Sequence, residues 1–393
     1  MGNKNMAVKN RERQTAVNSG RTMVSHSMAM TTADASQRHA VMDVGTNSVK
    51  LLVADMGQSL KPLLELSRQT WLGQGAFRTG RLQPEAMART VTAVAEFASK
   101  AIELRPASLR ILATSATREA TTAQELVQAI FNATGLPVEI LSGDQDADYV
   151  LQGVTNDPAI GVRPVLVVDV GGGSTEWVVG NGGLTQFRQS TKLGTSRLLE
   201  MCPPGDPPTR GDLARCRRVI ASFLRREVCP RLGPVLASFC GRRACLIGLG
   251  GTPKTIAWLA SGQHPESEPP TLLRWGQMGE QIERLWGLSS RERRNLSGLN
   301  PEKADVILTG AVIYEAVMSQ FKFTEMLMSR HEMGRGAVMS RATRVGTPRF
   351  SIAQQAPGPL LIGMRSEQNP APAVAPPQTW TPASSAPAAR QAK

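Results

Sequence analysis

The chain has 393 residues, 41% of them hydrophobic and 20% charged, with a formal net charge of +13. This length exceeds what one core usually needs and accommodates two domains with tails. The five cysteines are odd in number and lack CxxC spacing, so they indicate neither a disulfide framework nor a zinc site. No apolar stretch approaches the roughly 18 residues of a membrane helix, and the start lacks the apolar segment of a secretory signal. We therefore expect a soluble, cytoplasmic protein.

About half of the positive charge lies in the two ends of the chain, and the rest lies between them. Such an excess favours anionic partners in general and does not by itself separate a small substrate from nucleic acid. Aromatic residues make up only 4% of the chain, so a platform for stacking bases is lacking. We expect neither a nucleic-acid partner nor a membrane.

Residues 1–38 are polar and show no hydrophobic period, which predicts a disordered N-terminal extension. Residues 345–393 are rich in Pro, Ala and Gln, which predicts a disordered tail. Between these ends we expect an N-terminal lobe over residues 39–160 and a C-terminal lobe over residues 161–344.

The first lobe is predicted to begin with three strands and then to alternate helices and strands. Its first helix opens with Pro84 and repeats apolar residues at helical spacing. In chain order, the expected strands cover Ala40–Val44, Val49–Met56, Pro62–Trp71, Leu109–Ala113 and Val138–Leu141, and the expected helices cover Pro84–Leu104, Ala120–Ala133 and Asp144–Val154.

The second lobe is predicted to restart this pattern at the apolar run Pro164–Val168. The further strands cover Trp177–Gly180, Leu184–Gln189, Ala244–Leu249 and a segment near Met326, and the helices lie between Pro208 and Leu232, after Gly250-Gly251-Thr252, and over Pro301–Met318. The order β-β-β-α-β-α-β-α in each half fits a mixed sheet flanked by helices.

Each half begins with an apolar strand that ends in a carboxylate followed by glycine. The two segments are DVGTNS, from Asp43 to Ser48, and DVGGGSTE, from Asp169 to Glu176. Because glycine lacks a Cβ, backbone N–H groups can close around a phosphate oxygen at such a turn. A plain hairpin is the alternative for either segment alone, but two copies about one domain length apart indicate two lobes that face each other across a phosphate-binding cleft.

These residues resemble the exopolyphosphatase / guanosine pentaphosphate phosphatase family, within the superfamily of actin-like, sugar-kinase and chaperone ATPases. The resemblance spans about residues 39–342 and matches the short family type. It depends on AVMDVGTNSVKLLVADM, ATSATREA, VEILSGDQDADYVLQGV, VLVVDVGGGSTEWVVG and GLGGTPKTIA, of which DVGGGSTE is the most specific. It implies an α/β fold of two ribonuclease-H-like, actin-like lobes, with mixed sheets flanked by helices and a cleft between them.

The resemblance also implies a metal site and a phosphate site. Asp43, Asp169 and Glu176 are the candidate ligands for Mg²⁺ or another divalent cation, which prefers carboxylate oxygen and keeps part of its water. For the aspartates the alternative is a residue that caps its own turn. The candidate phosphate-binding residues are Gly45, Thr46, Asn47, Ser48, Arg118, Gly171, Gly172, Gly173, Ser174, Gly250, Gly251 and Thr252.

Arg118 carries a planar fork of donors that suits phosphate oxygens. The alternative for Arg118 is an exposed arginine paired with Glu119. Gly250, Gly251 and Thr252 resemble the segment that touches adenosine in nucleotide-using relatives, and here we expect them to border the cleft. A plain strand-to-helix turn is the alternative for these three residues.

The predicted catalytic residues are Asp146, Glu176 and Arg118. In the segment SGDQDA, from Ser142 to Ala147, the family usually has two glutamates directly before the alanine, and the second acts as general base. This chain has Gln145 and Asp146 at those positions. Aspartate keeps the carboxylate but shortens its reach by one methylene, and a misplacement near 1 Å can cost about 10²-fold in rate. Activity is therefore expected to be reduced, and Asp144 is either a substitute or a carboxylate that favours the helix start.

Taken together, these residues predict a metal-dependent exopolyphosphatase that releases terminal phosphate from inorganic polyphosphate. Hydrolysis of guanosine pentaphosphate, which would tie the chain to the stringent response, is the alternative within the same class. A catalytically weakened sensor that binds polyphosphate or an alarmone is the alternative from another class, and a sugar-kinase-like phosphotransferase is a third. A homodimer is one expected assembly, without a residue that specifies it.

Overall fold

The computed structural model describes residues 37–57, 59–155, 157, 160, 163–181, 184–239, 244–262, 272–329 and 331–342. The predicted tail and almost all of the predicted N-terminal extension lie outside the described residues. Gln37 and Arg38 are the exception, because they already belong to the first strand, and the predicted boundary at residue 38 is wrong by two residues. Arg38 is held there by an ion pair, in which its Nε lies 2.8 Å from Oδ1 of Asp55 on the neighbouring strand.

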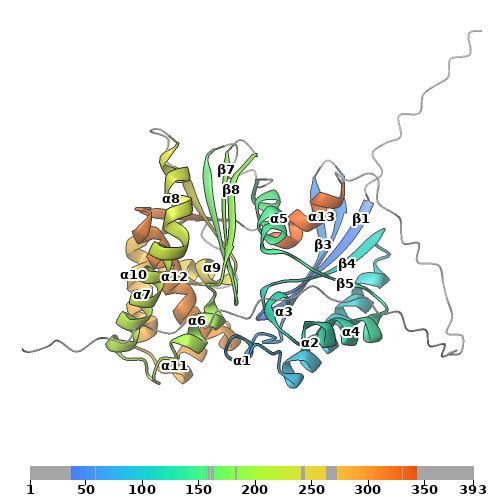
Figure 1. Cartoon of the computed structure of the whole chain (residues 1–393), viewed down its shortest axis with the longest axis horizontal. Coiled ribbons are helices and arrows are strands. Elements are labelled where there is room, and N and C mark those ends of the chain that lie inside the picture. Colours follow the sequence, from blue (N-terminus) through green and yellow to red (C-terminus); the bar gives the residue numbers. More distant parts are fainter. Residues whose placement is uncertain are drawn as a thin grey trace, which may run out of the picture. The chain divides into compact units, whose positions relative to one another are not determined.

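The first sheet has the strand order β3-β2-β1-β4-β5, with β1 antiparallel to β2 and parallel to β4. Helices α2 and α4 pack side by side against it (Figure 1). The strands are β1 (Gln37–Val44), β2 (Ser48–Met56), β3 (Leu60–Gln69), β4 (Ser108–Ala113) and β5 (Val138–Ile140), and the helices are α1 (Ala76–Thr79), α2 (Pro84–Glu103), α3 (Ser115–Glu119) and α4 (Ala123–Thr134).

The second sheet has the order β10-β11-β9-β6-β7-β8, and β6 is antiparallel to β7 and parallel to β9, as β1 is to β2 and β4. Its strands are β6 (Val165–Val170), β7 (Thr175–Asn181), β8 (Leu184–Thr191), β9 (Cys245–Leu249), β10 (Leu272–Arg274) and β11 (Glu325–Met328). Its helices are α6 (Thr195–Met201), α7 (Arg210–Phe223), η1 (Leu224–Val228), α8 (Cys229–Ala237), α9 (Gly251–Ser261), α10 (Trp275–Trp286), α11 (Ser290–Arg294), η2 (Pro301–Lys303) and α12 (Val306–Gln320). The repeated β-β-β-α-β plan confirms the predicted fold class.

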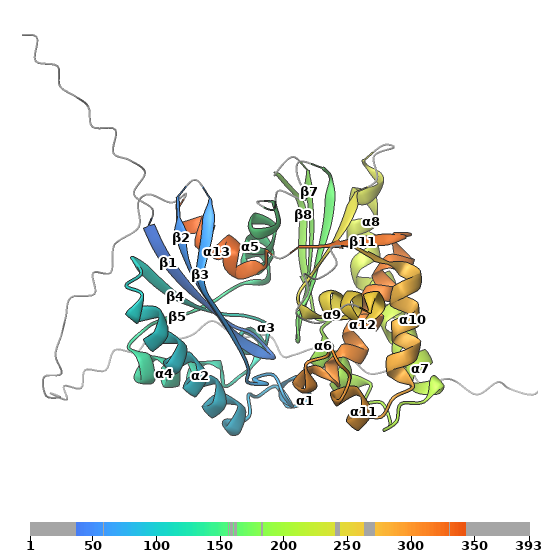
Figure 2. The same cartoon turned by 180° about the vertical axis from the view of Figure 1, so that it is seen from behind.

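Helices α5 (Gly143–Thr155) and α13 (Met333–Ala342) pack against each other, as the reverse view in Figure 2 shows. Their approach is so close that a Cβ added at Gly336 would overlap the backbone carbonyl of Tyr149. Helix α13 also contacts β1 and β2, whereas α5 also contacts β7 and β8. The last helix of the predicted C-terminal lobe therefore lies on strands of the first sheet, and the predicted division at residue 160 stays a prediction.

Each sheet has its own apolar core, and a third core is shared by the two sheets. The core of the second sheet surrounds Trp177 and the almost wholly buried helix α12, and that of the first lies between β1, β2 and helix α2. The shared core is built around α5 and α13 and includes strand residues of both sheets. Full burial of one large apolar side chain contributes roughly 1.5–3 kcal/mol, so these cores hold the strand ends that carry the site. In the described residues, no helix combines the length and the apolar character needed to cross a membrane.

Candidate active site

The loops after β1 and β6 form the same backbone turn. The N–H of Gly45 donates to the carbonyl of Ser48 at 3.0 Å, and the N–H of Gly171 donates to the carbonyl of Ser174 at 2.9 Å. Each turn therefore begins two residues after an aspartate at the end of a buried strand. The sequence predicted both loops from this pattern.

In the first loop, the carbonyl groups are held from behind. Gly73 N–H donates to the carbonyl of Thr46 at 2.8 Å, and the N–H groups of Thr70 and Trp71 donate to the carbonyl of Asn47. No described residue accepts a hydrogen bond from the N–H of Thr46 or Asn47. These two donors are free for an anion.

In the second loop, N–H groups from the start of α6 bind the carbonyl groups. The N–H groups of Thr195 and Ser196 donate to the carbonyls of Gly171 and Gly172, each at 2.9 Å. Within the described part of the chain, the N–H groups of Gly172 and Gly173 have no acceptor. Both loops thus offer N–H groups and turn their carbonyls away, which is the arrangement that binds a phosphate oxygen.

The two loops touch through Asn47. Its Oδ1 accepts a hydrogen bond from Oγ of Ser196 at 2.6 Å, and its Nδ2 donates to Oγ1 of Thr195 at 3.3 Å. A Cβ at Gly172 would overlap the Asn47 amide, so only glycine allows this approach. The predicted loops from the two halves of the chain therefore meet.

Four carboxylates gather where the two strands end, and the charges of Asp43, Asp169 and Glu176 raise the pKa values of neighbours in this group. Burial raises the pKa of Asp43 to about 6, with Lys50 opposing this rise and Glu332 adding to it. Burial, followed by the nearby charge of Glu176, raises the pKa of Asp169 to about 7. Such mutual repulsion shows that negative charge is concentrated in one place.

Asp146 and Glu176 complete this group and are almost fully buried, with 6% and 4% of their surface exposed. Burial and then the charges of Glu176, Asp43 and Asp169 raise the pKa of Asp146, and burial raises the pKa of Glu176. Oγ of Ser190 donates to Oε1 of Glu176 at 2.8 Å, which orients that carboxylate.

Arg118 lies beside Asp146, with its Nη1 4.0 Å from Oδ2 of Asp146 and 2.8 Å from the carbonyl oxygen of Leu141, to which it donates. It does not pair with Glu119 as the plainer interpretation supposed, because Glu119 is bound by Arg197 and Lys192. The guanidinium is therefore directed to the carboxylate group.

A divalent cation fits this group of carboxylates. Among the described residues, Oδ1 of Asp43 is buried without a hydrogen-bond partner, as is expected of an oxygen that takes a cation or one of its waters. Among the residues that the structure describes, no three potential ligands lie close enough together to hold a metal directly. Mg²⁺ suits such a site because it keeps several of its waters as ligands.

Comparison with known proteins agrees with this geometry. Residues 32–344 match the model of the Ppx/GppA phosphatase family. The chain belongs to this family. It is 32% identical to "Exopolyphosphatase 2" of Mycobacterium tuberculosis over 326 residues, which cover 78% of this chain and 98% of that protein.

Solved structures of similar proteins include a PPX-GPPA enzyme of Aquifex aeolicus, with 28% identity, a TM-score of 0.64, and coverage of 77% of this chain and 99% of that one. An exopolyphosphatase of Cytophaga hutchinsonii has 25% identity and a TM-score of 0.69, with coverage of 79% and 100%. The predicted resemblance to the Ppx/GppA family and its actin-like fold is confirmed.

The departure at Gln145 from the Ppx/GppA pattern has a structural explanation. Oε1 of Gln145 accepts from the N–H of Ser142 at 2.9 Å, while Oγ of Ser142 accepts from the N–H of Gln145 at 3.2 Å. This reciprocal capping starts α5, and Gln serves it as well as Glu. Asp144, with 66% of its side chain exposed, lies near Arg188, so it is no substitute for Asp146.

Four charged residues of the site were missed by the sequence reasoning. Lys50 of β2 and Lys254 of α9 both form ion pairs with Glu332, in which Nζ lies 2.6 Å and 3.1 Å from a carboxylate oxygen. Lys303 lies beside Gly251, where a Cβ would be 3.1 Å from its Nζ. Lys50 and Lys254 stand inside the quoted motifs, whereas Lys303 and Glu332 lie outside them and carry no local signal.

Gly250, Gly251 and Thr252 lie at the start of α9. A Cβ at Gly250 would be 3.6 Å from Oδ1 of Asp169, so this turn borders the carboxylates. Tyr314 of α12 fixes the same strand ends, because its hydroxyl donates to the carbonyl of Leu249 at 2.7 Å and accepts from the N–H of Val170 at 3.4 Å.

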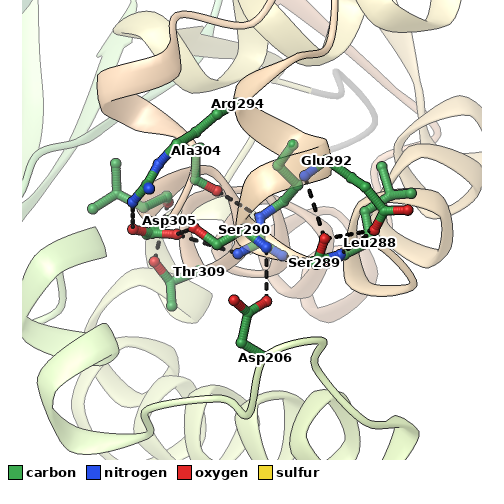
Figure 3. A network of polar contacts seen from close by, with 11 residues as sticks. Asp206, Leu288, Ser289, Ser290, Glu292, Arg294, Ala304, Asp305 and Thr309 are labelled. Atoms are coloured by element: carbon green, nitrogen blue, oxygen red, sulfur yellow. Dashed lines mark hydrogen bonds and ion pairs between the residues drawn. The ribbon is translucent and has the colours of Figure 1, made fainter.

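Helix α6 is supported by the start of α12. Oγ1 of Thr309 donates to the carbonyl of Thr195 at 2.8 Å. The network in Figure 3 joins the start of α12 to α11: Asp305 accepts from Oγ of Ser290 at 3.0 Å, and the N–H of Ser290 donates to Asp206 at 2.7 Å. The second loop is therefore backed by a rigid chain of contacts.

Proposed function

We propose that this member of the Ppx/GppA family is a metal-dependent exopolyphosphatase that releases terminal phosphate from inorganic polyphosphate. The observation that carries the proposal is the meeting of two loops, each with free N–H groups, beside the buried carboxylate of Asp146. The relative named exopolyphosphatase at 32% identity supports the choice of substrate. We also place the protein in the cytoplasm, where unpaired cysteines are stable.

The loops would bind the terminal phosphoryl group. The free N–H groups of Thr46, Asn47, Gly172 and Gly173 would donate to its oxygens, and Arg118 would add a charged donor. Phosphoryl transfer leaves the protein mainly the tasks of positioning and of stabilising charge. Contact between the loops through Asn47 would hold their N–H groups in place for this task.

Asp146 would accept the proton of the attacking water. A raised pKa suits a general base, which works best when its pKa lies near the operating pH. Glu176, oriented by Ser190, would help to place the water. A divalent cation, Mg²⁺ or another, held through Asp43, Asp169 and Glu176, would neutralise charge on the transferring group.

The test is phosphate release from long polyphosphate by purified protein with Mg²⁺, compared with the same preparation in excess chelator. We expect release only with the cation. Binding of polyphosphate without any release, unchanged in the variant Gln145→Glu with Asp146→Glu, would instead favour the sensor, whose motivation is the shortened carboxylate.

Guanosine pentaphosphate is the second candidate substrate, because its terminal anhydride is chemically the same. One observation favours it. A cavity of about 790 Å³ lies beside the loop contact and is lined by Trp71, Leu199 and Pro301 as well as Ser196, and a volume of this order holds a nucleoside. The test compares turnover of both substrates by the wild-type chain and by Trp71→Ala. The variant should lose turnover of guanosine pentaphosphate only, because the nucleoside would contact Trp71 and polyphosphate would not.

A further inference from the structure

Arg197 connects the second phosphate loop to the first lobe. It lies in α6, and only 12% of its side chain is exposed. Its Nη2 donates to Oε1 of Glu119 at 2.6 Å, and its Nε donates to the carbonyl of Gly173 at 2.7 Å. One guanidinium thus binds the last residue of α3 and the middle of the second loop at once.

The face of the same guanidinium is also in use. Its central carbon lies 4.0 Å from the centre of the Phe77 ring, in helix α1 of the first lobe. A cation over an aromatic face is attracted by the ring, and the planar guanidinium is well suited to such stacking. The hydrogen bonds at the edge of the guanidinium and the ring contact at its face together fix the orientation of the Arg197 side chain.

The contact with Gly173 determines how the peptide between Gly173 and Ser174 is oriented in the second loop. In a trans peptide the carbonyl of one residue and the N–H of the next point in opposite directions. Because Arg197 draws the carbonyl of Gly173 to itself, the N–H of Ser174 is turned the other way. A loop rich in glycine has no side chains of its own to fix this plane.

The contact with Glu119 fixes the neighbouring residue Arg118. Helix α3 has only five residues, so its own hydrogen bonds hold it weakly. Ser115 and Lys192 also bind Glu119, so Arg197 is not needed merely to neutralise this carboxylate. Of these three partners of Glu119, only Arg197 also binds the carbonyl of Gly173 and so links the end of α3 to the second loop.

We propose that Arg197 is a positioning residue for phosphoryl transfer, which aligns Arg118 of the first lobe with the Gly173–Ser174 peptide of the second. The expected changes in kcat and KM rest on the proposed function. The link that Arg197 makes between α3 and the second loop does not depend on that function. Arg197 need not touch the substrate, because its fork and its face are already occupied by Glu119, Gly173 and Phe77.

The kinetic test compares Arg197→Lys and Arg197→Ala with the wild-type chain on polyphosphate. Lysine keeps the positive charge but cannot reach Glu119, Gly173 and Phe77 together, so we expect kcat to fall about tenfold or more in both variants. KM should rise by about threefold or less in Arg197→Lys, because the charge near the anion is retained. A Lys variant with wild-type kcat would overturn the proposal.

Arg217→Ala is the matched control. Arg217 makes a comparable two-point ion pair with Glu315, at 2.8 Å and 2.7 Å, and both residues belong to helices of the second lobe. Loss of this pair should leave kcat and KM unchanged. A fall in kcat equal to that of Arg197→Ala would show that any broken arginine pair has the effect, which would contradict a specific role.

An independent readout is hydrogen exchange of α3, which lies in the lobe opposite Arg197. We expect exchange in residues 115–119 to become at least about tenfold faster in Arg197→Ala and in Glu119→Gln, and to be unaltered in Arg217→Ala. Unchanged exchange at α3 would overturn the link. If the wild-type chain releases no phosphate, the proposed function fails, while this exchange measurement still decides the role of Arg197.

Discussion

The two phosphate loops share a backbone turn but divide the work unequally. The first loop supplies side chains, since Thr46 and Asn47 reach across to the second. The second loop supplies room, because a Cβ at Gly172 would overlap Asn47, and a Cβ at Gly173 would lie 2.5 Å from the Phe77 ring. One glycine suffices in the loop that reaches out, whereas three are needed in the loop that is approached.

The aspartates that precede the two loops, Asp43 and Asp169, also differ in the charges around them. Asp43 has Lys50 nearby to oppose the effect of burial, and its pKa rises to about 6. Asp169 has Glu176 as its strongest charged neighbour, and its pKa rises to about 7. The second loop therefore carries more uncompensated negative charge than the first.

The largest expected effect is that of Asp146→Asn, because Asp146 faces both loops and belongs to neither. An amide cannot accept the proton of water, so kcat should fall by about 10²- to 10⁴-fold, with polyphosphate binding retained. Phosphate release under saturating substrate measures this. Asp144→Asn is the control, since its exposed side chain should be dispensable. Equal losses in both variants would contradict the assignment.

Gly173→Ala tests whether the second loop needs glycine so that residues of the first lobe can approach its backbone. The added Cβ would also lie 2.6 Å from Oγ of Ser115, so the lobes would be forced apart. We expect kcat/KM to fall by about 10²-fold, as for a displacement near 1 Å. Combining the change with Phe77→Ala should restore part of the loss, and an additive double variant would argue against the steric explanation.

Asp169→Asn should stabilise the metal-free protein, because it removes a buried charge. A carboxyl whose pKa is raised from 3.8 to about 7 binds its proton more tightly when folded, so its charge destabilises the fold increasingly as the pH rises through that window. We expect a gain of about 1–3 kcal/mol at pH ~8 and a smaller gain at pH ~5.

Asp43→Asn is the matched comparison for Asp169→Asn. Because the pKa of Asp43 rises only to about 6, its removal should give the smaller gain in the free energy of unfolding. Denaturant titrations in chelator at both pH values measure both variants. A larger gain for Asp43→Asn would reverse the electrostatic ranking of the loops.

The smallest expected effect is that of Asn47→Ala, which removes the hydrogen bonds to Thr195 and Ser196 but leaves the backbone N–H groups. Each such bond contributes roughly 0.5–1.5 kcal/mol net, so KM should rise by a few fold to about tenfold. Initial rates of phosphate release over a range of polyphosphate concentrations measure this, and an unchanged KM would show that the loops meet without help from Asn47.

The sequence predicted what is encoded locally. Apolar runs followed by Asp and Gly predicted the ends of β1 and β6, because a buried strand and a glycine turn each leave a local pattern. The third strand was predicted to reach Trp71 and ends at Gln69, since the N–H groups of Thr70 and Trp71 donate to Asn47 instead of to a strand.

Contacts between distant segments could not be predicted in this way. Helices α3 and α6 are too short to show a period, and they are held by Glu119, Arg197 and the loop carbonyls. Helix α10 was overlooked although its apolar residues Met278, Ile282 and Leu285 recur at helical spacing. Glu332 meets Lys50 across 282 positions, a pairing that no local pattern reveals.

The crossing of α5 and α13 has a mechanical consequence. Asp146 lies in the first turn of α5, the same helix that packs against α13 beneath Gly336. The position of the Asp146 carboxylate therefore depends on a contact between two helices that are about 190 positions apart in the chain. A side chain larger than hydrogen at position 336 would displace α5 and the start of this helix with it.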